Sequence, residues 1–294
     1  MLYLLKLIMH MRTLHLILLI GFSDVASAAP ISFGLFADTP YTQWQRENLA
    51  NLISDMNKDS LSFVVHAGDI KNGSSTCNDT VYQDILETFQ KSRHPFVYVP
   101  GDNESTDCDH KLNTAYDPLE RLEKLRSVFL SGKSSLGITK IKLSRQSEHP
   151  DFLQYRENVR WEMGGILFAT VNLPGSRNNF FGTTLGSDTQ EGPSAEFVQR
   201  SRANSKWMAD AFALAREKGI RGLVLIGHAN PGFERFKSAT ADPSYHDFLE
   251  QLRSETQSFN GEVVFVHGDT HNQHVDQPLG VRATEVFAKS GCGV

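Results

Sequence analysis

The stretch "FVYVPGDNESTDCDH", residues 96–110, decides the fold. Its β-branched and aromatic opening predicts a buried strand over Pro95–Val99, because such side chains pack well on a pleated surface. The strand runs directly into Gly101-Asp102-Asn103-Glu104, a glycine followed by two carboxylates and an amide. This ending predicts either a solvated turn or a metal site, and the ends of the other strands decide between the two.

Four more short apolar runs predict strands over Ile31–Ala37, Leu61–His66, Leu223–Ile226 and Val263–Val266. Between the first three strands, apolar residues recur at helical spacing over Trp44–Met56 and Val81–Phe89. Strands that alternate with helices predict right-handed crossovers and a largely parallel opening sheet. The chain is therefore expected to be of the α/β class.

Farther along the chain, helices are predicted over Leu119–Phe129 and Ala195–Glu217. The polar residues 131–152 predict a loop, and two antiparallel strands are expected on either side of Gly164-Gly165. The segment "VRATEVFA", residues 281–288, can supply one last strand. No internal repeat or low-complexity linker divides the chain, so residues 29–294 are expected to form a single domain.

The N-terminal residues 1–28 predict a secretory signal peptide. They contain Lys6 and Arg12, an apolar stretch over 14–22 and the cleavage pattern Ala26-Ser27-Ala28. A membrane anchor is the alternative, but the apolar stretch is short for a bilayer span. Met11 is an alternative start of the same signal. The protein is therefore expected to be exported, to the periplasm or the medium, with no stable membrane span after processing.

The net charge of the 294-residue chain is -5 at pH 7. A negative balance argues against a binder of nucleic-acid polymers or anionic membranes.

Each of the five predicted strands ends in a candidate metal ligand. In chain order, these ends carry Asp38, Gly68-Asp69, Gly101-Asp102, Gly227-His228 and His267-Gly268-Asp269-Thr270-His271. Open α/β sheets bind ligands beyond the carboxyl ends of their strands. Four carboxylates at one sheet edge would repel one another unless cations lay among them. The pattern therefore predicts a site for divalent metal ions.

Taken together, the motifs "DTP", "GDIKNG", "GDNE", "GH" and "GDTH" resemble those of the calcineurin-like metallophosphoesterases. The family pattern is D-x-H, G-D, G-N-H-(E/D), a lone His and G-H-x-H, and the resemblance covers residues 31–275. It implies a four-layer α-β-β-α sandwich of mixed sheets flanked by helices. It also implies two divalent metal ions and the hydrolysis of a phosphomonoester or phosphodiester by metal-bound hydroxide. The differences in "GDNE" and "GDTH" suggest a divergent, exported subgroup.

The resemblance assigns metal ligands position by position. They are Asp38, Asp69 and His271 for the first metal, and Asp69, Asp102, His228 and Asp269 for the second. Asp102 and Asp269 stand where the family has an amide and an imidazole. Because carboxylate oxygens suit hard cations, Mn²⁺ or Mg²⁺ is favoured, while Fe, Zn and Ca remain open.

Two further departures concern Pro40 and Asn103. Pro40 replaces the histidine of D-x-H, so the first metal loses an imidazole ligand. Asn103 replaces the histidine that the family uses to stabilise the transition state and to protonate the leaving oxygen. An amide donates a hydrogen bond but no proton near pH 7. Either the metal pair carries most of the reaction, or His66, His110 or His246 substitutes, with His66 the first choice by position. The alternative for His66 is a buried strand histidine whose hydrogen bond is satisfied.

Five other residues complete the expectations. Glu104 is expected to support the ligands from behind, and Asn72 to shape the loop after Asp69. Arg177 either binds a phosphate oxygen or lies in a solvated loop. Cys77 and Cys108 each follow a Gly-Asp pair, and in an exported protein they predict a disulfide if their loops are neighbours.

Two functions of different classes remain open at this point. The first is a phosphoesterase acting on a small phosphorylated substrate. The second is a metal-binding protein that recognises a phosphorylated ligand without turnover, which the replacements at Pro40 and Asn103 favour.

Overall fold

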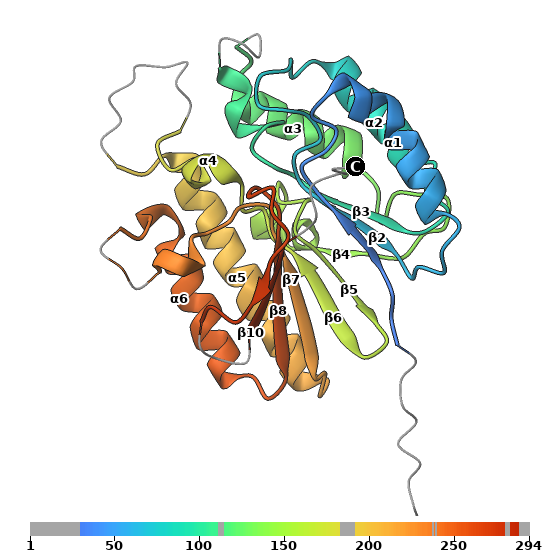
Figure 1. The fold of residues 1–294 in the computed structure, drawn as a ribbon. Helices are drawn as coiled ribbons and strands as arrows, with labels where there is room; N and C mark the ends of the chain where they lie inside the picture. The colour runs from blue at the N-terminus through green and yellow to red at the C-terminus, as the bar shows by residue number, and fades with distance from the viewer. Residues whose placement is uncertain are drawn as a thin grey trace, which may run out of the picture.

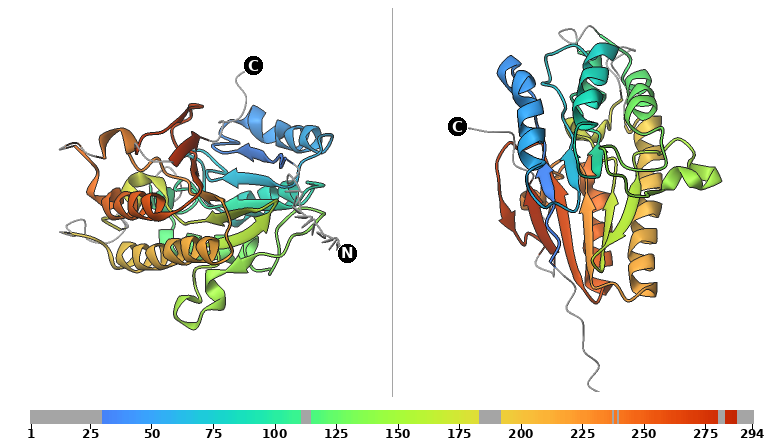
Figure 2. Two further views of the ribbon diagram at one scale, coloured as in Figure 1. Left: turned by 90° about the horizontal axis from the view of Figure 1, so that it is seen from below. Right: turned by 90° about the vertical axis from the view of Figure 1, so that its right-hand side faces the viewer.

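The computed structural model describes residues 30–279, apart from 111–114, 183–191, 237 and 239, together with the backbone of 283–287. Two β-sheets pack face to face, and helices cover both outer faces (Figure 1). Figure 2 shows the same layers from two other sides. The α/β class with sheets flanked by helices is confirmed, and of the two sheets only the second is mixed.

The first sheet has the order β1 (Gly34–Phe36), β2 (Val64–Ala67) and β3 (Phe96–Val99), and all its strands are parallel. Its outer face carries α1 (Gln43–Met56), α2 (Asp79–Phe89) and α3 (Pro118–Phe129) (Figure 1). Helix α1 is capped by Thr42, whose side chain accepts from the backbone N–H of Gln45 in a capping box. The predicted parallel opening of the chain is confirmed.

The second sheet has the strand order β4-β5-β6-β7-β8-β10-β9. Its strands are β4 (Ser144–Arg145), β5 (Val159–Met163), β6 (Ile166–Thr170), β7 (Gly222–Ile226), β8 (Glu262–His267), β9 (Val275–Asp276) and β10 (Ala283–Phe287). Strands β5 and β6 form the predicted antiparallel pair, and β10 confirms the predicted last strand by pairing in parallel with β8. Helices α5 (Ala195–Glu217) and α6 (Pro243–Ser258) cover the outer face (Figure 1).

Two segments differ from the sequence prediction. Helix α6 was not predicted, although Asp242 caps it and Pro243 occupies its first turn. The predicted loop 131–152 contains β4, which pairs with β5 at the edge of the sheet. The remaining short elements are α4 (Gly175–Asn178) and the 3₁₀ turns Thr106–Asp109, Gln146–Glu148, Pro150–Phe152 and Phe233–Arg235.

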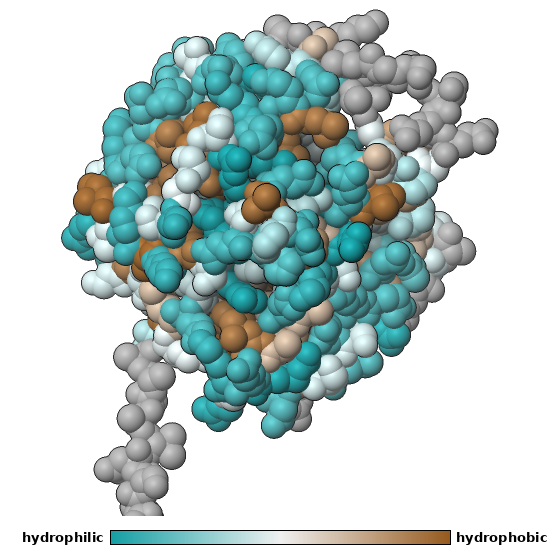
Figure 3. Space-filling view, turned by 180° about the vertical axis from the view of Figure 1, so that it is seen from behind, coloured by the Kyte–Doolittle hydropathy of each residue, from teal (hydrophilic) through white to brown (hydrophobic). Residues whose placement is uncertain are grey.

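The apolar core has three parts that account for the four layers. The central part lies between the sheets and includes Phe63, Val97, Trp161 and Phe168. The other two fill the space between each sheet and its helices. Figure 3 shows a surface that is largely hydrophilic on one face, with separate apolar spots. Among the described residues, no helix is both long and apolar enough to cross a membrane.

Candidate metal centre

The loops that follow five strands meet at one end of the two sheets. The first sheet delivers Asp38, Asp69 and Asp102, and the second delivers His228 and Asp269. Contacts cross between the sheets: His228 Nε2 lies 3.3 Å from Asp69 Oδ1 and 3.1 Å from Asp102 Oδ1. The backbone N–H of Asp269 donates to both carboxylate oxygens of Asp38, at 3.0 and 3.2 Å.

The backbone at these positions is unusual. Asp38, Asp69, Asp269 and His271 have φ angles of 56°, 66°, 70° and 58°, in the left-handed region that non-glycine residues seldom adopt. Each such residue costs about 1–3 kcal/mol, and strain of this kind gathers at functional sites. Gly68 is required by close approach, because an added Cβ would lie 2.2 Å from His228 Nδ1.

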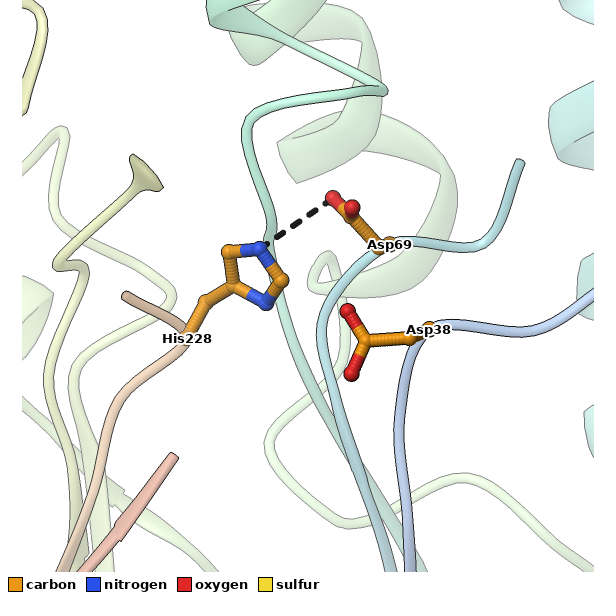
Figure 4. Close-up of side chains that lie close together, drawn as sticks. All are labelled: Asp38, Asp69 and His228. Atoms are coloured by element: carbon orange, nitrogen blue, oxygen red, sulfur yellow. Dashed lines mark ion pairs between the residues drawn. The ribbon is translucent and has the colours of Figure 1, made fainter. Parts of the chain in front are cut away.

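The orientation of His228 is fixed by a backbone carbonyl. Its Nδ1 lies 2.8 Å from the oxygen of Ala67, which accepts only, so Nδ1 carries the proton and donates. Nε2 is thereby turned toward Asp69 (Figure 4) and toward Asp102. Burial lowers the pKa of His228, but the carboxylates of Asp69 and Asp102 outweigh burial and raise that pKa well above 6.5.

The carboxylates of Asp38, Asp69 and Asp102 differ in the direction of their pKa shift. Burial raises the pKa of Asp38 and that of Asp69. Burial also favours a higher pKa for Asp102, but hydrogen bonds from His228 and Ser176 outweigh burial and lower this pKa to about 2. Because these carboxylates repel one another, a compensating positive charge is needed if all three are to be ionised at once.

The donor set fits divalent metal ions. Asp38, Asp69 and His228 form one group, and Asp102, His228 and Asp269 form another, with ligand atoms within 4.8 Å of one another in each. His271 stands at the rim, with Nε2 3.6 Å from Asp38 Oδ1. Carboxylate oxygens outnumber imidazole nitrogens, which is the chemistry that Mn²⁺ and Mg²⁺ prefer.

The sequence profile described as calcineurin-like phosphoesterase matches residues 22–273. The chain belongs to this family. A search of curated proteins by sequence gives no match.

Among solved structures, a dimetal phosphatase from Danio rerio is similar to this chain. It shares 14% identity, covers 88% of this chain and 87% of its own, and has a TM-score of 0.50. The anchor protein GAP50 of Plasmodium shares 10% identity over 89% of this chain and 72% of its own, with a TM-score of 0.47. A purple acid phosphatase from Lupinus luteus shares 11% identity over 88% of this chain and 44% of its own, also with a TM-score of 0.47.

Within this phosphoesterase-family site, Asn103 lies directly over Asp69. Its backbone N–H donates to Asp69 Oδ1 at 3.1 Å, and its side-chain amide donates to Asp69 Oδ2. The side chain therefore reaches the cluster of candidate ligands, as a hydrogen-bond donor without a proton to transfer.

Glu104 lies behind the cluster and is fully buried. Its Oε1 accepts from the backbone N–H groups of Asp69 and Gly101, at 3.1 and 2.6 Å, and from the hydroxyl of Tyr98 at 2.8 Å. Its Oε2 accepts from the N–H of Ile70 at 3.2 Å. One carboxylate thus ties the loop after β2 to the loop after β3.

The structure places His66 away from the cluster. Its side chain packs among Phe36, Phe89 and Tyr98, and its Nε2 lies 2.9 Å from the carbonyl oxygen of Thr39. Burial lowers its pKa to about 3. The ring supports the loop after β1 from the core side and is not among the residues that meet at the strand ends.

Asn72 and the disulfide shape the loops beside the cluster. Asn72 Nδ2 donates to the carbonyl of Tyr41 at 2.6 Å, and its Oδ1 accepts from the N–H of Ser74 at 2.8 Å. Cys77 and Cys108 form the predicted disulfide, which joins the loops after β2 and β3.

Arg177 lies in a left-handed turn, labelled α4, in the loop after β6. Ser176, Arg177, Asn178 and Asn179 have φ angles of 46°, 56°, 56° and 52°. Arg200 supports this turn from the core by donating to Asn178 Oδ1 at 2.6 Å and to its carbonyl oxygen at 2.8 Å. The turn brings Ser176 Oγ to 2.7 Å from Asp102 Oδ2 and leaves Arg177 exposed beside it.

Sequence reasoning missed three residues of the site. Ser176 contacts Asp102, buried Lys71 donates to the carbonyl of Asn103 at 2.5 Å, and the Tyr41 hydroxyl lies among the candidate ligands. Lys71 lies inside the motif "GDIKNG", two positions after the candidate ligand Asp69, and this nearby positive charge could have pointed to it. Ser176 and Tyr41 each lie next to a residue that the sequence analysis singled out, Arg177 and Pro40 respectively.

Proposed function

We propose that this protein is an exported metal-dependent phosphoesterase that hydrolyses small phosphomonoesters or phosphodiesters. The observation that carries the proposal is the convergence of Asp38, Asp69, Asp102, His228 and Asp269 from two sheets, in a chain of the calcineurin-like phosphoesterase family. The Cys77–Cys108 disulfide supports export, because disulfides persist in oxidising compartments. The predicted signal peptide lies outside the described residues.

The proposed metal ligands are the six assigned from the motifs. Asp69 would bridge two ions, with Asp38 and His271 on one side and Asp102, His228 and Asp269 on the other. Divalent ions at this site would supply an activated water and would neutralise charge that develops on the phosphoryl group.

The proposed work of the surrounding side chains follows from their contacts. Asn103 would donate a hydrogen bond to a phosphoryl oxygen, since its amide already lies over Asp69. Arg177, exposed next to Ser176, would bind a second phosphate oxygen. Neither of them protonates a leaving group, so esters with good leaving groups are expected to react much faster than alkyl esters.

The test is hydrolysis by the purified, Mn²⁺-loaded protein on a panel of aryl and alkyl phosphomonoesters and phosphodiesters. Asp69→Asn should lower kcat/KM at least about 100-fold, because metal assistance is worth several kcal/mol. Asp59→Asn, the same change at an exposed aspartate, is the matched control. If the Mn²⁺-loaded wild type hydrolysed none of the esters on the panel, the proposed phosphoesterase activity would be refuted.

The second candidate function is a metal-binding protein that recognises a phosphorylated ligand without turnover. Asn103 favours it, because the site lacks a proton donor where the family has histidine. Stabilisation by metal plus phosphate in a thermal shift, with no hydrolysis on the panel, would identify this alternative.

A further inference from the structure

The side chain of Tyr41 lies at the centre of the site. Its hydroxyl oxygen is 3.2 Å from Asp38 Oδ1, 2.5 Å from Asp69 Oδ2 and 3.2 Å from His271 Nε2. These are the three residues assigned to the first metal, from three separate segments of the chain. Asn103 Nδ2 lies 3.2 Å from the same oxygen.

The contacts of the Tyr41 oxygen are short enough for atoms that share one ion. An octahedral ion with bonds of about 2.1 Å holds neighbouring ligand atoms about 3 Å apart. The Tyr41 oxygen stands 2.5–3.2 Å from its three neighbours, and Asp38 Oδ1 and His271 Nε2 stand 3.6 Å apart. The Tyr41 hydroxyl has one proton to donate, yet two carboxylates, Asp38 and Asp69, face its oxygen.

The loop after β1 holds Tyr41 in this position. The Tyr41 N–H donates to Gln45 Oε1 at 2.6 Å, and its carbonyl accepts from Asn72 Nδ2, also at 2.6 Å. The ring packs edge to face on His271, with centroids 5.2 Å apart. Because both backbone groups and the ring are fixed, the oxygen is presented to the acidic cluster at little further entropic cost.

We propose that the Tyr41 hydroxyl oxygen is a ligand of the first metal ion, in place of the imidazole that Pro40 removes. This inference rests on the metal centre of the proposed function. On binding, the O–H bond breaks, the proton passes to the buffer and an oxygen–metal bond forms. The first site then has Asp38, Tyr41, Asp69 and His271, with three oxygens and one nitrogen, which again suits a hard cation.

The test compares Tyr41→Phe with wild type in Mn²⁺ binding to the metal-stripped protein, by equilibrium dialysis with elemental analysis. The substitution removes one oxygen and keeps the ring. It should weaken the binding of the first ion at least about tenfold. This is the lower end of the loss in affinity when a residue that only hydrogen-bonds to a metal ligand is removed. Tyr155→Phe, whose ring packs beside Phe152 and Arg126, is the matched control and should bind as wild type.

The ultraviolet difference spectrum gives a second readout that does not depend on activity. Titration of the wild type and of Tyr155→Phe with Mn²⁺ should produce a tyrosinate signal that Tyr41→Phe lacks. Unchanged Mn²⁺ affinity in Tyr41→Phe would overturn the inference. Tighter Mn²⁺ binding by Tyr41→Phe would also overturn it, because the phenol would then obstruct the first site. A wild type that binds no Mn²⁺ would overturn it as well. A wild type that binds Mn²⁺ through Tyr41 and hydrolyses nothing would leave this inference standing and refute the phosphoesterase.

Discussion

Replacing Glu104 with alanine tests whether the loops that carry Asp69 and Asp102 depend on one buried carboxylate. The substitution leaves four donors without an acceptor: the N–H groups of Asp69, Ile70 and Gly101 and the Tyr98 hydroxyl. Each buried, unsatisfied donor costs about 1–3 kcal/mol. The lower bound gives a loss of about 4 kcal/mol in the free energy of unfolding, or roughly 8–16 °C in Tm for a chain of this size.

The assay is equilibrium unfolding in urea of the metal-free protein, without reductant, followed by circular dichroism. Glu104→Gln keeps one oxygen, which can retain the three donors on Oε1, and turns its amide toward the N–H of Ile70. It should therefore lose only about 1–3 kcal/mol. Glu217→Ala, an exposed glutamate near the end of α5, should stay within about 0.5 kcal/mol of wild type. A loss below about 1 kcal/mol for Glu104→Ala would refute the reasoning.

Three further perturbations address the rest of the site. A disulfide that closes a separation of 31 residues restricts the unfolded chain, so removing it with Cys77→Ser and Cys108→Ser should cost about 4 kcal/mol of unfolding free energy; a loss within error would contradict this reasoning. Despite burial, neighbouring carboxylates raise the pKa of His228, so the Tm of the metal-free protein should fall as pH rises from 6.5, and His228→Asn should flatten that slope. Gly175→Ala should displace Asp102, because its Cβ would lie 2.6 Å from Oδ2, and Mn²⁺ binding measured by dialysis should weaken at least about tenfold; unchanged binding would remove this contact from the site.

The parts of this site that sequence reasoning reached are those set by strand ends. A run such as "FVYV" that stops at Gly-Asp fixes both the strand and the edge to which Asp102 is delivered. The parallel order of β1, β2 and β3 then brings Asp38 and Asp69 to the same edge. For these residues the position at a strand end was enough to predict that they meet, because parallel strands run in one direction and end at the same edge.

The parts that sequence reasoning missed depend on direction and loop shape. His66 precedes Asp69 by only three residues, but it points from β2 into the aromatic core under the helices, since successive side chains of a strand face opposite sides. Tyr41 reaches the cluster through a loop whose course depends on Asn72 and Gln45. Ser176 reaches Asp102 through four successive left-handed residues, which no propensity scale would assign to "GSRNN".

Helix α6 was missed for another reason. Its apolar residues are sparse, and the buried positions include Ser244 and Thr256 together with Tyr245, Leu249 and Leu252. A pattern search based on hydrophobicity alone passes over a helix whose buried face is partly polar. The proline after a capping aspartate was the stronger signal.

The origin of the candidate ligands in two different sheets has a consequence for the lifetime of the protein. An ion held by Asp69 from the first sheet and His228 from the second would act as a cross-link between halves of the molecule that otherwise meet mainly through apolar packing. At a free metal concentration 100 times the dissociation constant, such a link adds about 2.7 kcal/mol to the folded state. Metal supply would then govern resistance to proteases as well as turnover, so that scarcity of the ion would reduce the amount of the protein before it slowed any reaction.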